Sequence, residues 1–106
     1  MSLKKVLVTG SSRGIGNSIL EIFSSKEFIP IGTATSNIGV EKIKQNFIDN
    51  NIQGFAYELN LDDKNSIDNF FAAIKDDDLN PDILINNAGI ARDNLMLRMS
   101  EEDWSE

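Results

Sequence analysis

Short apolar runs alternate along this chain with segments in which apolar residues recur every three or four positions. Residues 6–8 form a β-branched run between two lysines and a Thr-Gly pair, which predicts a strand buried on both faces. Residues 28–35 and 83–85 are similar runs, and residues 55–59 alternate with the period of two of a strand. Four strands are therefore expected.

The three intervening segments have the period of helices that pack on a sheet. We expect the first helix to end near Lys26 and the second to stop at residues 50–51. Asp62 or Asp63 is expected to cap the third. The side chains expected to face the sheet are Ile15, Ile19, Ile22 and Phe23, then Val40, Ile43, Phe47 and Ile48, then Ile67, Phe70, Phe71 and Ile74.

The alternation of strands and helices indicates the fold class. It predicts parallel β-α-β units, hence an α/β, Rossmann-type doubly wound parallel sheet, truncated after about four strands. Pro30 counts against an internal position for the strand at residues 28–35, unless it lies at the strand's start, because proline has no N–H for the ladder.

Composition narrows the function classes. Ten basic and seventeen acidic residues give a net charge of -7, so nucleic acid and anionic membranes are not expected as partners. The chain has no cysteine and no histidine, so chemistry that needs a thiolate or an imidazole is excluded. The adjacent carboxylates at residues 76–78 are expected to be solvated rather than to bind a metal. The N-terminus reaches Gly10 too soon for a signal peptide, so a cytoplasmic location is expected.

Three glycines follow the first predicted strand directly and open the first predicted helix. Gly10, Gly14 and Gly16 have the spacing G-x-x-x-G-x-G, in the sequence TGSSRGIG at residues 9–16. A helix N-terminus presents backbone N–H groups to an anion, and glycine permits both the tight turn and a close approach. The segment therefore predicts a binding site for the diphosphate of a dinucleotide.

These motifs resemble those of the short-chain dehydrogenase/reductase family. The signature T-G-x-x-x-G-I-G is matched at residues 9–16, and a second family motif, N-N-A-G, stands at residues 86–89. Residues 31–36, 86–99 and 102–104 are further similar to bacterial 3-oxoacyl-[acyl-carrier-protein] reductases. The resemblance implies NADPH-dependent reduction of an acyl-carrier-protein-linked substrate in fatty acid biosynthesis, and a homo-tetramer for the full-length form. Residues 1–106 would then be the N-terminal part of a single NADP-binding domain.

The segment after the second strand favours NADP(H) over NAD(H). An NAD site places a carboxylate there for the ribose hydroxyls, but residues 33–37 contain none. Arg13 and the hydroxyl of Thr35 could instead bind the extra 2′-phosphate, and the resemblance agrees with both roles.

The resemblance implies further cofactor contacts. Asn60 would meet the adenine amine and Leu61 the adenine face, although Asn60 alone also fits a turn-forming asparagine before a helix. Residues 87–89 would line the adenosine ribose. The backbone of Ser12 and Ile15 would hold the phosphates. The complete expected set is Gly10, Ser11, Ser12, Arg13, Gly14, Ile15, Gly16, Thr35, Asn60, Leu61, Asn87, Ala88 and Gly89.

No catalytic residue is expected within the chain. The family's proton donor is a Tyr followed four residues later by a Lys, with a Ser and an Asn, whereas the only tyrosine here, Tyr57, is followed by Leu61. Residues 100–104 have the pattern of a capped helix start, so we expect the parent protein to continue beyond Glu106. The strand at residues 83–85 would then leave an open sheet edge, and residues 1–106 alone would lack reductase activity.

Two other functions stay open. A non-catalytic dinucleotide-binding module would need the glycine turn but no catalytic residues. A methyltransferase with an adenosyl-methionine site on a similar sheet would normally require an acid after the second strand, and the motif at residues 86–89 has no role in it.

Overall fold

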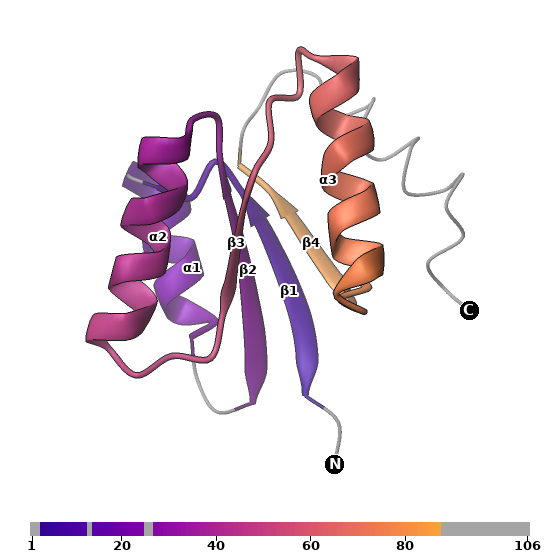
Figure 1. Cartoon of the computed structure of the whole chain (residues 1–106). Helices are drawn as coiled ribbons and strands as arrows, with labels where there is room; N and C mark the ends of the chain where they lie inside the picture. Colours follow the sequence, from indigo (N-terminus) through magenta and orange to yellow (C-terminus); the bar gives the residue numbers. More distant parts are fainter. Residues whose placement is uncertain (1–2, 13, 25–26, 88–106) are drawn as a thin grey trace.

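The computed structural model describes residues 3–12, 14–24 and 27–87. These residues form a parallel sheet with helices on both faces (Figure 1). The strands lie in the order β3-β2-β1-β4, and every pair of neighbours is parallel, which confirms the predicted α/β doubly wound fold. The elements are β1 (Lys4–Thr9), α1 (Gly14–Ile22), β2 (Phe28–Ala34), α2 (Asn37–Asp49), β3 (Phe55–Glu58), α3 (Lys64–Asp76) and β4 (Ile83–Asn86).

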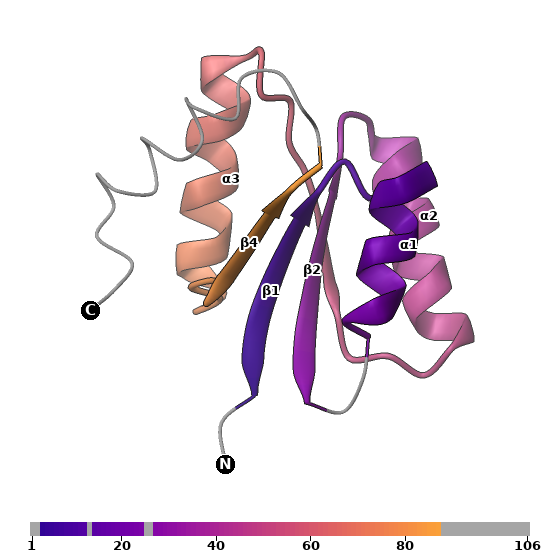
Figure 2. The same ribbon diagram turned by 180° about the vertical axis from the view of Figure 1, so that it is seen from behind.

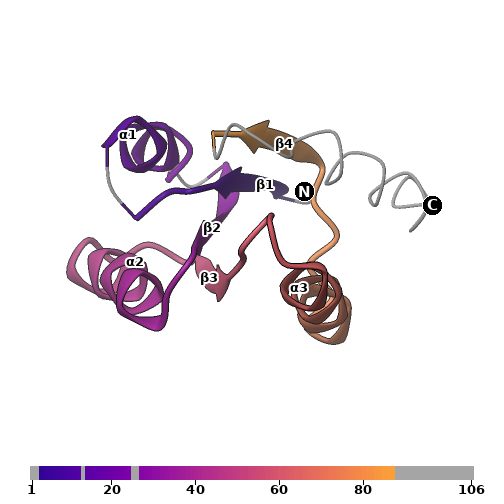
Figure 3. The ribbon, with the colours of Figure 1, turned by 90° about the horizontal axis from the view of Figure 1, so that it is seen from above.

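Helices α1 and α2 lie on one face of the sheet and α3 lies on the other (Figures 2 and 3). Val6 and Val8 join the core beneath α1 and α2, whereas Leu7 joins the core beneath α3. All three side chains have no exposed surface. Strand β1 is therefore buried on both faces, as its run of apolar residues predicted.

The chain reverses its direction of winding around β1. It passes outward from β1 to β2 and β3, then crosses the sheet and returns to pair β4 with the other side of β1. The carboxyl ends of β1 and β4 flank this reversal, which is where open α/β sheets bind their ligands. In the part of the chain that the structure describes, β4 pairs with β1 alone.

Two helix starts are fixed by side-chain caps. The Ser36 hydroxyl accepts a hydrogen bond from the Gly39 N–H at 3.2 Å and begins α2. The Asp63 carboxylate accepts one from the Asn65 N–H at 3.0 Å and begins α3, so Asp63 is the cap among the two aspartates considered.

Several positions expected in the helix stripes are not buried. Ile15, Ile22 and Ile48 are 73%, 72% and 69% exposed, and the fully buried residues of α1 are Gly16 and Leu20. Ile19 and Phe23 pack against the core as predicted, so the apolar period of α1 predicted half of its sheet-facing positions and missed Leu20. Helix α1 also ends at Ile22, earlier than the expected end near Lys26.

Pro30 occupies an internal strand, against the sequence-based expectation. It is the third residue of β2 and pairs with Val6 of β1. Strand β3 first pairs with β2 at Ile31, so Pro30 lies before that ladder begins and its missing N–H interrupts no bond to β3. Strand β3 ends at Glu58, one residue short of the predicted end at Leu59.

The register of α1 can be tested with a pair of alanine substitutions. Leu20→Ala is expected to lower the free energy of unfolding by about 2–5 kcal/mol, because it empties space in the core beneath α1. Ile22→Ala should change it by less than about 0.5 kcal/mol, because this side chain is exposed. Urea denaturation of the two variants measures both values, and a larger loss at Ile22 than at Leu20 would contradict the structure.

Candidate functional site

The glycine turn connects the centre of the sheet to the start of α1. Gly10 and Gly14 have positive φ values of 61° and 65°, a region that other residues rarely adopt. A Cβ on Gly16 would come within 2.1 Å of the Gly10 carbonyl oxygen and 2.6 Å of the Asn87 Nδ2. Glycine at position 16 therefore lets the first turn of α1 lie directly against the end of β1.

Strand β2 contacts one side of this turn. The Gly10 N–H donates to the Thr33 Oγ1 at 3.1 Å, and the Ser11 N–H donates to the Thr33 carbonyl oxygen at 2.8 Å. The Thr33 N–H in turn donates to the Ser11 Oγ at 3.0 Å. Ser11 and Thr33 are both buried. The N–H and hydroxyl of Ser11 are thus already engaged by the sheet.

The first two residues of the N-N-A-G motif contact the other side. The Thr9 hydroxyl donates to the Asn86 Oδ1 at 2.9 Å, and the Asn87 Nδ2 donates to the Gly10 carbonyl oxygen at 3.1 Å. The Asn86 Nδ2 is buried, and no acceptor for it lies among the described residues. The two sequence motifs therefore meet at Gly10, while Ala88 and Gly89 lie outside the described residues.

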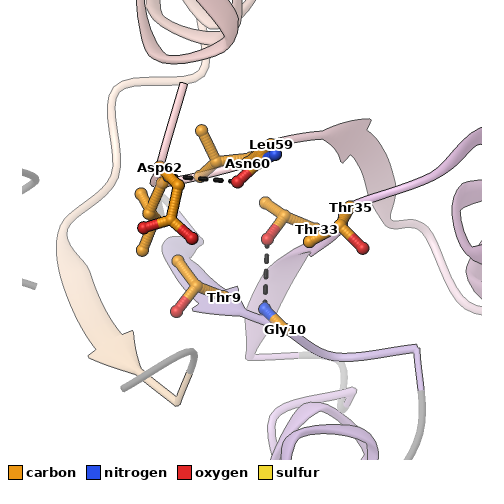
Figure 4. A pocket seen from close by; sticks show the side chains of 8 residues that line it. Thr9, Gly10, Thr33, Thr35, Leu59, Asn60 and Asp62 are labelled. Atoms are coloured by element: carbon orange, nitrogen blue, oxygen red, sulfur yellow. Dashed lines mark hydrogen bonds between the residues drawn. The ribbon is translucent and has the colours of Figure 1, made fainter. Parts of the chain in front are cut away.

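A cavity of about 160 Å³ opens at the carboxyl ends of β1, β2 and β3 (Figure 4). It brings together four of the residues predicted to bind the cofactor, Gly10, Thr35, Asn60 and Leu61, which come from three separate parts of the sequence. The complete lining is Thr9, Gly10, Thr33, Thr35, Leu59, Asn60, Leu61 and Asp62.

Asn60 adopts the turn-forming role that the sequence left open beside the adenine contact. Its Oδ1 accepts from the Asp62 N–H at 3.0 Å, and its own N–H donates to the Ser66 Oγ at 2.8 Å. The side chain also lines the cavity, so an adenine contact stays a prediction. Leu61 is 8% exposed and belongs to the core beneath α3.

The other residues of the glycine turn that were predicted to bind the cofactor follow Gly10 in the chain. Ser12 lies beside the start of α2, since a Cβ on Gly39 would come 3.4 Å from the Ser12 Cβ. Gly14 and Ile15 are the first two residues of α1, and the Ile15 side chain is exposed. Arg13 lies outside the described residues.

Sequence reasoning missed Thr9, Thr33, Leu59 and Asp62, which also line the cavity. A signal existed for Thr33, because it precedes Thr35 by two positions and a strand places such residues on the same side.

Within residues 3–12, 14–24 and 27–87, no three acidic side chains gather closely enough to hold a metal ion. No helix of the described part is long and apolar enough to cross a membrane.

Tyr57 belongs to the packing between β3 and α3, as its alternating strand pattern predicted. Its ring meets that of Phe70 edge to face, with the centroids 5.8 Å apart. Its hydroxyl donates to the Asp77 carboxylate, and burial together with this carboxylate raises the pKa of Tyr57 far above its usual value. The phenol therefore keeps its proton and does not line the cavity at the glycine turn.

Comparison with known proteins identifies the family. The family model described as short chain dehydrogenase matches residues 4–106. The chain belongs to the short-chain dehydrogenase family. The resemblance of the two motifs is thereby confirmed, and the family is one of oxidoreductases.

Several curated relatives of this short-chain dehydrogenase are named 3-oxoacyl-[acyl-carrier-protein] reductase FabG. The protein from Haemophilus influenzae is 50% identical over 104 residues, which cover 98% of this chain and 42% of the relative. Those from Vibrio cholerae and Escherichia coli K12 are 47% and 43% identical over 103 residues, covering 97% of this chain and 41% of each relative. The chain thus spans 41–42% of the length of these relatives.

The close approach at Gly16 can be tested by adding one methyl group. Gly16→Ala is expected to lower the free energy of unfolding by about 1–3 kcal/mol, because the new Cβ would overlap the Gly10 carbonyl oxygen. This loss opposes the gain that alanine normally brings to a helix. Glu21→Ala, at an exposed position of the same helix, serves as the control and should stay within about 0.5 kcal/mol of the parent chain in urea denaturation. A Gly16→Ala variant as stable as this control would contradict the packing described.

Proposed function

We propose that this chain is the cofactor-binding half of an NADPH-dependent 3-oxoacyl-[acyl-carrier-protein] reductase. The reaction is the reduction of an acyl-carrier-protein-linked 3-oxo group to a 3-hydroxy group in fatty acid biosynthesis. The observation that carries the proposal is the cavity beside the glycine turn, where Gly10, Thr35, Asn60 and Leu61 converge. Family membership and the names of the relatives support the substrate class.

The start of α1 binds the diphosphate in this proposal. The backbone N–H groups of Ser12 and Ile15 lie where the positive end of the helix dipole stabilises an anion. No acidic residue stands in the first turn of α1 to oppose it. Gly14 at the helix start leaves open space, since a Cβ there would meet no atom within 4 Å.

The cavity receives the adenosine. The Asn60 Oδ1 uses one lone pair for the Asp62 N–H, and a carbonyl oxygen has a second lone pair that can accept from the adenine amine. Leu61 offers an apolar contact for the adenine face. Asn87, which contacts Gly10 from the side of β4, lines the ribose, and Ala88 and Gly89 are assigned the same role from their place in the motif.

The choice of NADP(H) rests on the residues after β2. Thr35 follows the strand and lines the cavity, and residues 33–37 contain no carboxylate that would repel a 2′-phosphate. Asp62 lines the same cavity, but it follows β3 and does not take the position of an NAD-type ribose carboxylate. Arg13, within the glycine turn, supplies the positive charge.

The bound nicotinamide cofactor supplies the hydride, and this chain's residues hold and orient its adenosine and diphosphate. The proton donor of the family lies outside residues 1–106 in this proposal. The remaining parts of the proposal concern the full-length enzyme: an acyl-carrier-protein-linked substrate, a homo-tetrameric assembly and a cytoplasmic location.

Replacing Arg13 tests the cofactor preference. Arg13→Ala is expected to weaken NADPH binding roughly 10- to 100-fold and to leave NADH binding unchanged, because only NADPH carries the 2′-phosphate. Titrations that follow the fluorescence of the reduced nicotinamide measure both affinities. Lys42→Ala, which removes the same charge from an exposed site on α2, is the control and should bind NADPH like the parent. Unchanged NADPH affinity in Arg13→Ala would refute this role of the arginine.

Residues 1–106 alone are expected to show no oxidation of NADPH with a 3-oxoacyl-[acyl-carrier-protein] substrate. A positioned proton donor contributes typically ~10² to 10⁴ in rate, and none is assigned within this chain. Absorbance of NADPH followed over time measures turnover, and any turnover dependent on the acyl substrate would contradict the assignment of catalysis to later residues. A downstream sequence without a Ser and a Tyr-x-x-x-Lys would instead favour a non-catalytic NADP-binding module.

A further inference from the structure

Thr33 contacts the glycine turn through both its side chain and its backbone, and Figure 4 shows the side-chain contact with Gly10. Its Oγ1 accepts from the Gly10 N–H at 3.1 Å, and its carbonyl oxygen accepts from the Ser11 N–H at 2.8 Å. The Ser11 hydroxyl completes the arrangement, since its oxygen accepts from the Thr33 N–H at 3.0 Å and it lies 3.4 Å from the Thr33 carbonyl oxygen. One residue of β2 therefore satisfies the first two amides of the turn.

These contacts divide the amides of the turn into two groups. The N–H groups of Gly10 and Ser11 donate into the sheet and are not available to a ligand. The diphosphate must then be held by amides from Ser12 onward. The first group anchors the part of the turn that immediately precedes the second group.

The contacts between Ser11 and Thr33 are buried, whereas the bond from the Gly10 N–H to the Thr33 Oγ1 is partly buried at the edge of the cavity. Thr33 is 1% exposed and Ser11 has no exposed surface, so the Ser11 N–H or the Thr33 N–H would have no water to replace a lost partner. Gly32 provides the space for the Ser11 hydroxyl, because a Cβ there would come 2.7 Å from the Ser11 Oγ. Gly10 and Ser11 are thus held in place by groups that a ligand does not supply.

We propose that Thr33 is a positioning residue for cofactor binding, which acts through Gly10 and Ser11 to order the phosphate-binding amides before the cofactor arrives. This inference rests on the proposed function. A turn that is already ordered loses little conformational freedom on binding, so the affinity for the diphosphate is higher than that of a turn ordered only by its ligand.

The chemistry of the side chain permits a matched pair of variants. Thr33→Val keeps the β-branched shape but removes the acceptor of the Gly10 N–H. Thr33→Ser keeps this hydroxyl and removes a methyl group. If Thr33 acted through packing alone, Thr33→Val would bind NADPH better than Thr33→Ser. If Thr33 acts through its hydroxyl, as proposed, Thr33→Ser binds NADPH better.

The experiment compares the parent chain with both variants in binding NADPH and adenosine. NADPH affinity is measured by nicotinamide fluorescence, and adenosine affinity by NMR chemical-shift titration. Thr33→Val is expected to raise the Kd for NADPH at least 10-fold and to leave the Kd for adenosine within twofold, because valine keeps the β-branched shape of the cavity wall and adenosine has no diphosphate. Thr33→Ser should bind NADPH within about threefold of the parent.

Three outcomes would overturn the inference while the proposed function stands. One is a Thr33→Val variant that binds NADPH within twofold of the parent chain. The second is an equal loss of affinity for NADPH and adenosine, which would assign Thr33 to the shape of the cavity alone. The third is Thr33→Ser binding no better than Thr33→Val.

A measurement on the parent chain keeps the inference testable if Thr33→Val does not fold. Amide hydrogen exchange without cofactor should show the Gly10 and Ser11 N–H groups as protected as those of β1, and rapid exchange at both would overturn the inference. If the parent chain itself binds no NADPH, the proposed function fails and this inference fails with it.

Discussion

The parallel register of β1 with its two neighbours determines which residues meet at the functional edge. Val8 pairs with Gly32 of β2, and Thr9 pairs with Asn86 of β4. The residues that follow these pairs, Thr33 and Asn87, therefore lie on the two sides of Gly10. A slip of one residue in either ladder would turn their side chains to the other face, so the site requires the same register as the core.

This edge is polar although it is buried. Thr9, Ser11 and Thr33 have almost no exposed surface, and each is engaged by a hydrogen bond across the sheet or to the turn. Buried polar groups that satisfy one another hold a single geometry, because any alternative leaves a donor without an acceptor. Strands β2 and β4 accept the hydrogen bonds of Thr9, Gly10 and Ser11, so the proposed anion site uses the N–H groups from Ser12 onward.

The sequence predicted the strands and helices because their apolar periods are clear. Residues 6–8 could only be a strand buried on both faces, and the alternation of elements implied the parallel topology. The buried face of α1 was predicted only in part, because Ile19 and Phe23 pack on the core while Leu20, outside the expected stripe, is buried and Ile15 and Ile22 are exposed. The sequence also argued against an internal position for the strand that contains Pro30. The strand can be internal because β3 begins to pair only at Ile31, and this starting point depends on the tertiary structure.

The candidate site was predicted in part for equally physical reasons. Gly10 and Gly16 belong to a motif whose residues are adjacent in the chain, and Asn87 to a second motif. Thr33 was missed because a threonine within a strand has the ordinary appearance of a β-branched residue. Its proposed role depends on a partner 23 positions away, Gly10, and only the paired strands bring the two together.

The site also joins the two cores of the molecule. Leu61, which lines the cavity, belongs to the core beneath α3, whereas Leu20 in the helix that follows the glycine turn belongs to the core beneath α1 and α2. A ligand that contacts the cavity and the turn together binds only when both layers are packed on the sheet. Binding is therefore linked to the folding of the whole described unit. A ligand that binds only the folded state raises the free energy of unfolding by RT ln(1 + L/Kd), where L is the concentration of free ligand.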